Sequence, residues 1–65
     1  MIFLEAGKTY KFNILDAAGK VLATIETSPE GFRFFNETED SVSLYDNGAI
    51  TQLPKSTGLT IKQEV

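Results

Sequence analysis

The chain has 65 residues, enough for one domain, and a chain of this size buries only about 60% of the surface that its unfolded form exposes. It has no cysteine and no histidine, which excludes disulfides and nearly excludes a zinc staple. A hydrophobic fraction of 42% is too high for a disordered chain, and a net charge of −3 argues against a broad nucleic-acid surface or docking on an anionic membrane. We therefore expect a single folded domain over residues 1–65, stabilised by a compact core or by self-association.

The first residues, Met1–Leu4, are apolar but are followed directly by Glu5. This run is too short for a signal peptide and has no basic leader, so we expect a soluble, cytoplasmic and complete reading frame. The tripeptide Gly7-Lys8-Thr9 ends many phosphate-binding loops, but such a loop needs an earlier glycine where this chain has Ile2. We interpret the tripeptide as a turn at Gly7 that leads into a strand.

Alternating polar and apolar residues predict strands along nearly the whole chain. The six predicted strands are Thr9–Ile14, Val21–Thr27, Phe32–Phe35, Ser41–Tyr45, Ala49–Leu53 and Leu59–Lys62. The short connections favour antiparallel pairing between neighbours, with room for one helical turn at Glu37–Asp40 or Pro54–Thr57. We expect an all-β fold, a small antiparallel barrel or a curved meander of five to six strands. The alternative is an open sheet that is completed by a second copy.

The alternation also predicts which side chains face the core. Tyr10, Phe12 and Ile14 share one face of the first strand. In the third strand the same reasoning places Phe32 and Phe34 in the core, which would point Arg33 and Phe35 outward.

Asp46-Asn47-Gly48 is the tightest predicted turn, and it allows two registers. A two-residue Asn47-Gly48 loop places Tyr45 opposite Ile50, whereas a three-residue loop places Leu44 opposite Ile50. We favour the second register because it pairs two aliphatic side chains.

The face opposite the predicted core also carries large apolar residues. The set comprises Leu15, Leu22, Phe35, Tyr45 and Leu53. Three interpretations stay open: ordinary surface residues, an oligomer interface and a ligand groove. The residues we assign to a candidate interface are Leu22, Arg33, Phe35 and Tyr45.

The stretch Gly31-Phe32-Arg33-Phe34-Phe35 resembles the Gly-Phe-Gly-Phe strand of cold-shock domains. Phe32 and Phe34 match the aromatic positions, Arg33 replaces the intervening glycine, and the family's second aromatic motif is missing. The resemblance implies stacking on single-stranded bases. Because we expect Phe32 and Phe34 in the core, the residues available for stacking would be the outward ones. Our alternative function is thus a single-stranded nucleic-acid binder that uses Phe35, Tyr45 and Arg33.

Catalytic chemistry would have to rely on carboxylates, lysines or tyrosines. Glu37, Glu39 and Asp40 are close in sequence, but in a polar turn they indicate a solvated loop, with a weak calcium or magnesium site as the alternative. We therefore expect no enzyme, no cofactor and no metal. Our main hypothesis is a structural or interaction protein that forms homo-oligomers. Small acidic β-proteins of this kind are frequent in bacteriophage and bacterial accessory genes, which is a background expectation about origin.

Overall fold

The computed structural model describes residues 1–64, and these residues form seven strands and one 3₁₀ turn. The elements are β1 (Ile2–Phe3), β2 (Lys11–Leu15), β3 (Val21–Glu26), β4 (Arg33–Glu37), β5 (Ser41–Asp46), β6 (Ala49–Pro54), η1 (Lys55–Thr57) and β7 (Thr60–Glu64). The all-β prediction is confirmed, each of the six predicted strands is present, and the helical turn after Pro54 is η1. The short strand β1 was not predicted.

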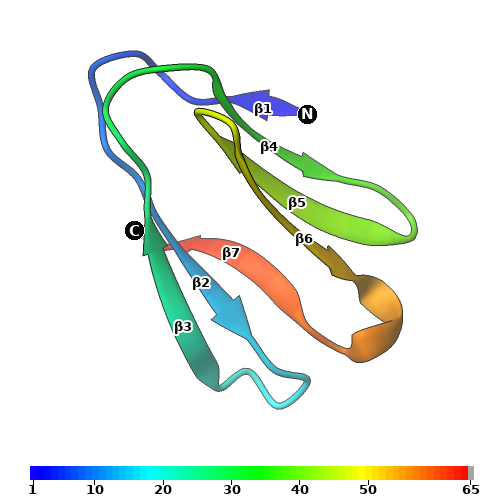
Figure 1. The fold of residues 1–65 in the computed structure, drawn as a ribbon. Coiled ribbons are helices and arrows are strands. Elements are labelled where there is room, and N and C mark those ends of the chain that lie inside the picture. Colours follow the sequence, from blue (N-terminus) through cyan, green and yellow to red (C-terminus); the bar gives the residue numbers. More distant parts are fainter. Residues whose placement is uncertain (65) are drawn as a thin grey trace.

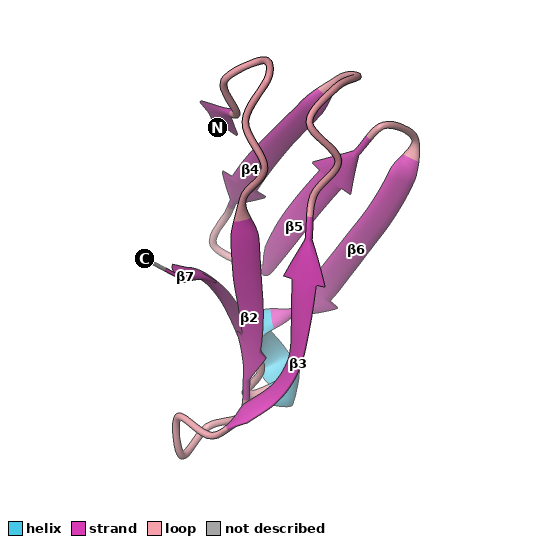
Figure 2. Cartoon of the chain, turned by 90° about the vertical axis from the view of Figure 1, so that its left-hand side faces the viewer, coloured by secondary structure: helices cyan, strands magenta, loops and turns pink. Residues whose placement is uncertain are grey.

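The strands form two antiparallel sheets that face each other (Figures 1 and 2). One sheet has the order β1-β4-β5-β6 and the other has the order β3-β2-β7. Pairing between sequence neighbours therefore holds for β2–β3 and for β4–β5–β6, whereas β7 pairs with β2 and β1 pairs with β4. No closed barrel is found over residues 1–64. Two layers have a simple physical advantage, because each sheet buries its apolar face against the other.

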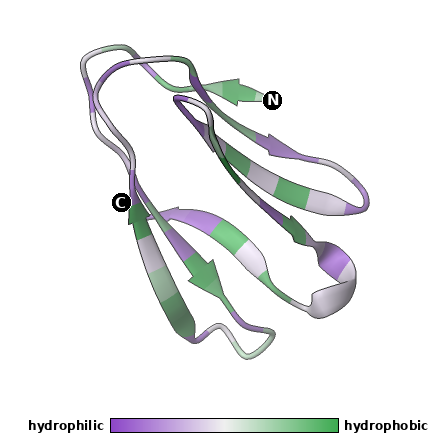
Figure 3. Ribbon diagram, viewed as in Figure 1, coloured by the Kyte–Doolittle hydropathy of each residue, from purple (hydrophilic) through white to green (hydrophobic). Residues whose placement is uncertain are grey.

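The core lies between the two layers. Phe12 and Ile61 come from one sheet, Val42 and Leu44 come from the other, and each is at most 2% exposed. Half-buried residues surround these four: Leu4, Tyr10, Ile14, Ile25, Phe35 and Leu53. Figure 3 shows the alternation of hydrophobic and polar residues along β5 that this arrangement requires. The predicted core face of β2 is confirmed.

The predicted facing of β4 is wrong. Arg33 is 2% exposed and points inward, and Phe35 stacks on Phe12 in the core, with the ring centroids 5.6 Å apart. Phe32, which we expected in the core, is 65% exposed. Because side chains alternate along a strand, the inward position of Arg33 and Phe35 places Phe34 on the outer face.

Backbone carbonyls explain why an arginine can be buried here. The guanidinium of Arg33 donates to the carbonyl oxygens of Glu5 at 2.7 Å and of Lys8 at 2.5 Å, and also to that of Ser28. A longer contact of 3.4 Å reaches the hydroxyl of Thr27. Buried polar groups are tolerated when they are hydrogen-bonded. Arg33 thus joins the loop before β2 to the loop before β4.

The turn between β5 and β6 differs from the favoured register. Asn47 and Gly48 both have positive φ, 48° and 92°, as a two-residue type I′ loop requires. Tyr45 therefore lies opposite Ile50, and the preferred pairing of Leu44 with Ile50 is wrong. The twist of this turn type matches that of the strands, and this outweighs the aliphatic pair that we favoured. As a result, Tyr45 and Ile50 both belong to the outer face.

Candidate functional site

An apolar row crosses the outer face of the sheet β1-β4-β5-β6. The register places Phe3 opposite Phe34, Phe34 opposite Tyr45, and Tyr45 opposite Ile50. The row therefore carries one large side chain from each of the four strands. Neighbouring strands lie about 4.8 Å apart, so side chains in such a row are in contact across the sheet.

The aromatic rings of this row pack against one another. Phe34 and Tyr45 are stacked with centroids 4.2 Å apart, and the ring of Phe3 lies 5.7 Å from that of Phe34. Phe32 joins the group at 5.1 Å from Phe34 and 5.7 Å from Phe3. We call Phe3, Phe32, Phe34, Tyr45 and Ile50 the aromatic face. Phe3, Phe32 and Ile50 are each about 60% exposed, so most of their apolar surface contacts solvent.

The neighbouring row of the same outer face is polar but uncharged. It consists of Asn36, Ser43 and Gln52, which lie opposite one another on β4, β5 and β6. Neither row contains a lysine, arginine, aspartate or glutamate. These two adjacent rows therefore carry no formal charge, and Ser43, the middle residue of the polar row, is 4% exposed.

The outer face of the second sheet has the opposite character. Lys11 lies opposite Glu26 on one side, with 4.0 Å between the charged groups, and opposite Glu64 on the other. Asn13 accepts a hydrogen bond of 2.8 Å from Thr24. These are the charged and polar pairs expected of a surface in water. Val21 and Leu22 are also exposed on β3, but no exposed aromatic ring lies on the described strands of this sheet.

The four residues assigned to an interface from the sequence do not form one surface. Tyr45 belongs to the aromatic face, and Leu22 lies on β3 in the other sheet with 53% exposure. Arg33 is buried, and Phe35 is part of the core packing. Both were assigned to the surface from the wrong facing of β4.

Sequence reasoning missed Phe3, Phe32 and Ile50 as exposed residues. A usable signal was the loop Asn47-Gly48: its two-residue form places Tyr45 and Ile50 together on one face. No comparable local signal places Phe3 there, since its position depends on pairing with a strand 31 residues further along the chain.

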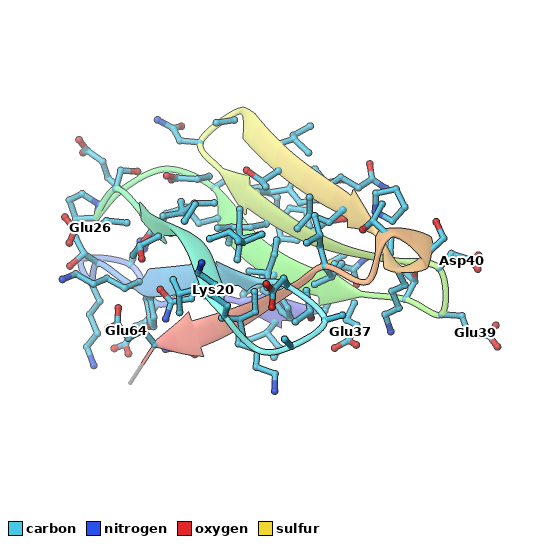
Figure 4. The ribbon with its side chains drawn as sticks, turned by 90° about the horizontal axis from the view of Figure 1, so that it is seen from below. Lys20, Glu26, Glu37, Glu39, Asp40 and Glu64 are labelled. Carbon is cyan, nitrogen blue, oxygen red and sulfur yellow. The ribbon has the colours of Figure 1, made fainter. Side chains whose placement is uncertain are left out.

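The three carboxylates of the acidic turn, Glu37, Glu39 and Asp40, do not form a metal-binding cluster. Glu37 binds Lys55 at 2.8 Å, while Glu39 and Asp40 project outward at the tip of the β4–β5 hairpin (Figure 4). The hydrogen bond and the charge of Lys55 hold the pKa of Glu37 below its usual value, with a smaller contribution from the charge of Lys62. At the other end of the molecule, Glu5 raises the pKa of Lys8 by the same two effects. No cluster of three metal-ligating side chains is found in residues 1–64.

No family model, curated protein or solved structure matches this chain. Within residues 1–64, no helix has both the length and the hydropathy that a membrane span requires. The function of the chain must therefore be inferred from the surfaces of the molecule itself.

Proposed function

We propose that this protein is a non-enzymatic interaction protein, and that it self-associates through the aromatic face. The observation that supports this is the coincidence of exposed aromatic rings with two adjacent rows that contain no charged residue. Two copies can bring such faces together without burying an unpaired charge, which would be costly. A two-fold dimer places the same patch on both sides of the interface, so an uncharged apolar face is complementary to itself.

The size of the aromatic face predicts a weak dimer. With about 200 Å² for each aromatic side chain, the exposed parts of the face amount to about 350 Å² per copy. The total of about 700 Å² for two copies is below the roughly 1,200 Å² of stable interfaces. We expect a dissociation constant on the order of 0.1 mM.

The proposed dimer covers the outer face of one sheet and leaves the sheet edges as they are. The two sheets leave β1, β6, β3 and β7 as edge strands. We infer that the protein is an open structure whose apolar face is covered by another copy, in preference to a closed barrel. The cytoplasmic location and the bacteriophage or bacterial accessory origin stay predictions.

The alternative, a single-stranded nucleic-acid binder, is less well supported. Of the residues assigned to it, Arg33 and Phe35 are inside the protein, and only Tyr45 lies on the aromatic face. Stacking platforms for single strands combine aromatic residues with a positively charged groove. The two outer rows of this sheet provide the aromatic residues without the cations.

Sedimentation equilibrium over a range of protein concentrations tests the proposal. We expect the average mass to rise above the 7.2 kDa of one chain as concentration increases. If half of the exposed ring of Phe32 is buried in each copy, Phe32→Ser costs about 3 kcal/mol per dimer, or roughly a hundredfold in the dissociation constant. Leu22→Ser is the matched control, because Leu22 is similarly exposed on the other sheet and we expect no change. A wild type that stays monomeric at millimolar concentration contradicts the proposal.

The salt dependence of binding distinguishes self-association from nucleic-acid binding. Each copy carries a charge of −3, so raising the salt from about 0.02 M to about 0.5 M should strengthen dimerisation by screening repulsion. Nucleic-acid binding responds in the opposite direction, because salt weakens it. Binding to a short single-stranded oligonucleotide that falls steeply with salt would favour the alternative.

A further inference from the structure

A second apolar feature lies between the two sheets, away from the aromatic face. It is a groove of about 250 Å³ beside the edge strands β1 and β7. Its apolar lining comprises Ile2, Leu4, Phe12, Phe35 and Ile61. The groove thus runs along the margin of the hydrophobic core, on the side where the two-residue strand β1 pairs with β4.

The groove has charged residues at its margin. Glu37 and Lys62 both line it, and both are exposed. Glu37 is already paired with Lys55, whereas Lys62 has no ion pair among residues 1–64. With Lys55 neutralising Glu37, the charge of Lys62 leaves one excess positive charge at this margin. The whole chain, by contrast, carries −3.

We propose that this groove binds a small amphipathic carboxylate, with its aliphatic chain against Ile2 and Phe35 and its carboxylate beside Lys62. The volume is about eight times the roughly 30 Å³ that a water molecule occupies in the liquid, which suits a chain of about eight carbon atoms. The charge at the margin favours a carboxylate over an amine of the same length. Small apolar pockets with a few polar groups at one end are typical of such ligand sites.

This site is independent of the proposed dimer. Ile2, Phe35 and Leu4 lie on the inner side of their sheet, whereas Phe3 and Phe34 lie on the outer side. A ligand in the groove and a second copy on the aromatic face can therefore be present together. It follows that loss of dimerisation leaves the groove intact.

Titration of the ¹⁵N-labelled full chain with sodium octanoate, followed by amide chemical shifts, tests the site. We expect saturable shifts at Phe12, Phe35, Ile61 and Lys62, with a dissociation constant of about 1 mM because the ligand is small. Octylammonium should bind more weakly than octanoate. Equal binding of the two, or shifts centred on the aromatic face, would overturn the proposal.

Single substitutions distinguish binding in the groove from binding elsewhere on the surface. Lys62→Gln should weaken octanoate binding about two- to fivefold, as expected for one exposed charge, and should leave octan-1-ol binding unchanged. Lys20→Gln is the control, since Lys20 belongs to the β2–β3 turn and does not line the groove. Phe32→Ser should bind octanoate as the wild type does, so failure of the dimer and failure of the groove are distinguishable. An unchanged octanoate affinity in Lys62→Gln would refute the assigned position of the carboxylate.

Discussion

Replacement of Arg33 by methionine tests the most unusual contact of the interior. Methionine is flexible and apolar, so it can fill the space of the side chain without donating hydrogen bonds. The carbonyl oxygens of Glu5, Lys8 and Ser28 then lose their charged donor. A buried acceptor that loses its partner costs about 1–3 kcal/mol, and bonds to charged groups are at the strong end of the range.

The net effect is smaller than the sum of these bonds, because burying the guanidinium has its own cost. Its Nε atom is buried without a partner, and no carboxylate forms an ion pair with it in residues 1–64. Desolvation of such a group costs several kcal/mol, which offsets part of the gain. We expect a net loss of about 3 kcal/mol for Arg33→Met. A domain of 65 residues has a free energy of unfolding of about 3–10 kcal/mol, so the variant loses between a third and all of it.

Urea unfolding followed by circular dichroism measures this loss. Arg33→Lys keeps the charge and some of the donors, so we expect a loss of about 1–2 kcal/mol. This second variant gives a reading even if Arg33→Met does not fold. Lys20→Met, an exposed control, should stay within about 0.5 kcal/mol of the wild type. If Arg33→Met is also within about 0.5 kcal/mol, the carbonyl contacts do not stabilise the fold and the reasoning fails.

Two further predictions concern local geometry and charge. Gly31 has φ of +91°, and a Cβ atom there would lie 2.5 Å from the side chain of Asn47. Gly31→Ala should therefore lower the free energy of unfolding by about 2 kcal/mol or more. A variant that is as stable in urea as the wild type would contradict this. The pKa of Glu37 is lowered by Lys55, so the pair stabilises the fold above the usual pKa of 4.5, and this contribution is lost as the pH falls through the lowered value. Glu37→Gln should therefore unfold at lower urea concentration than the wild type at neutral pH, with a difference that disappears in acid; a difference that persists unchanged in acid would refute the assignment.

The strands were predictable from local patterns. The alternation in Tyr10 to Ile14 predicts both a strand and its buried face, because a half-buried strand repeats every two residues. The tightest turn was predictable as well, since Asn47-Gly48 suits positive φ at both positions. Its register was not, because the aliphatic pair that we favoured is a weaker preference than the geometry of the loop.

The pairing of the strands and the aromatic face were not predictable in this way. The stretch Phe32–Phe35 has large apolar residues at both alternating sets of positions, with Phe32 and Phe34 in one set and Phe35 in the other. Alternation alone therefore allows either set to face the core. The acceptors that select between them belong to distant loops, and Glu5 is 28 residues from Arg33. The pairing of β1 with β4 and of β7 with β2 likewise depends on how the two layers close over the core. Such long-range choices are tertiary, and no local window of the sequence contains them.

The facing of β4 connects the stability of the fold to its surface. The opposite facing would bury Phe32 and Phe34, each worth about 1.5–3 kcal/mol if fully buried. It would also remove Phe35 from its stack on Phe12 and leave the carbonyls that Arg33 binds without a charged donor. The loss of the Phe35 stack cancels about half of the gain, and the loss of the arginine contacts, at about 3 kcal/mol, is as large as the rest or larger. Exposed aromatic rings are therefore a consequence of placing the arginine inside, and a second copy that covers them would recover apolar burial that the single chain gives up.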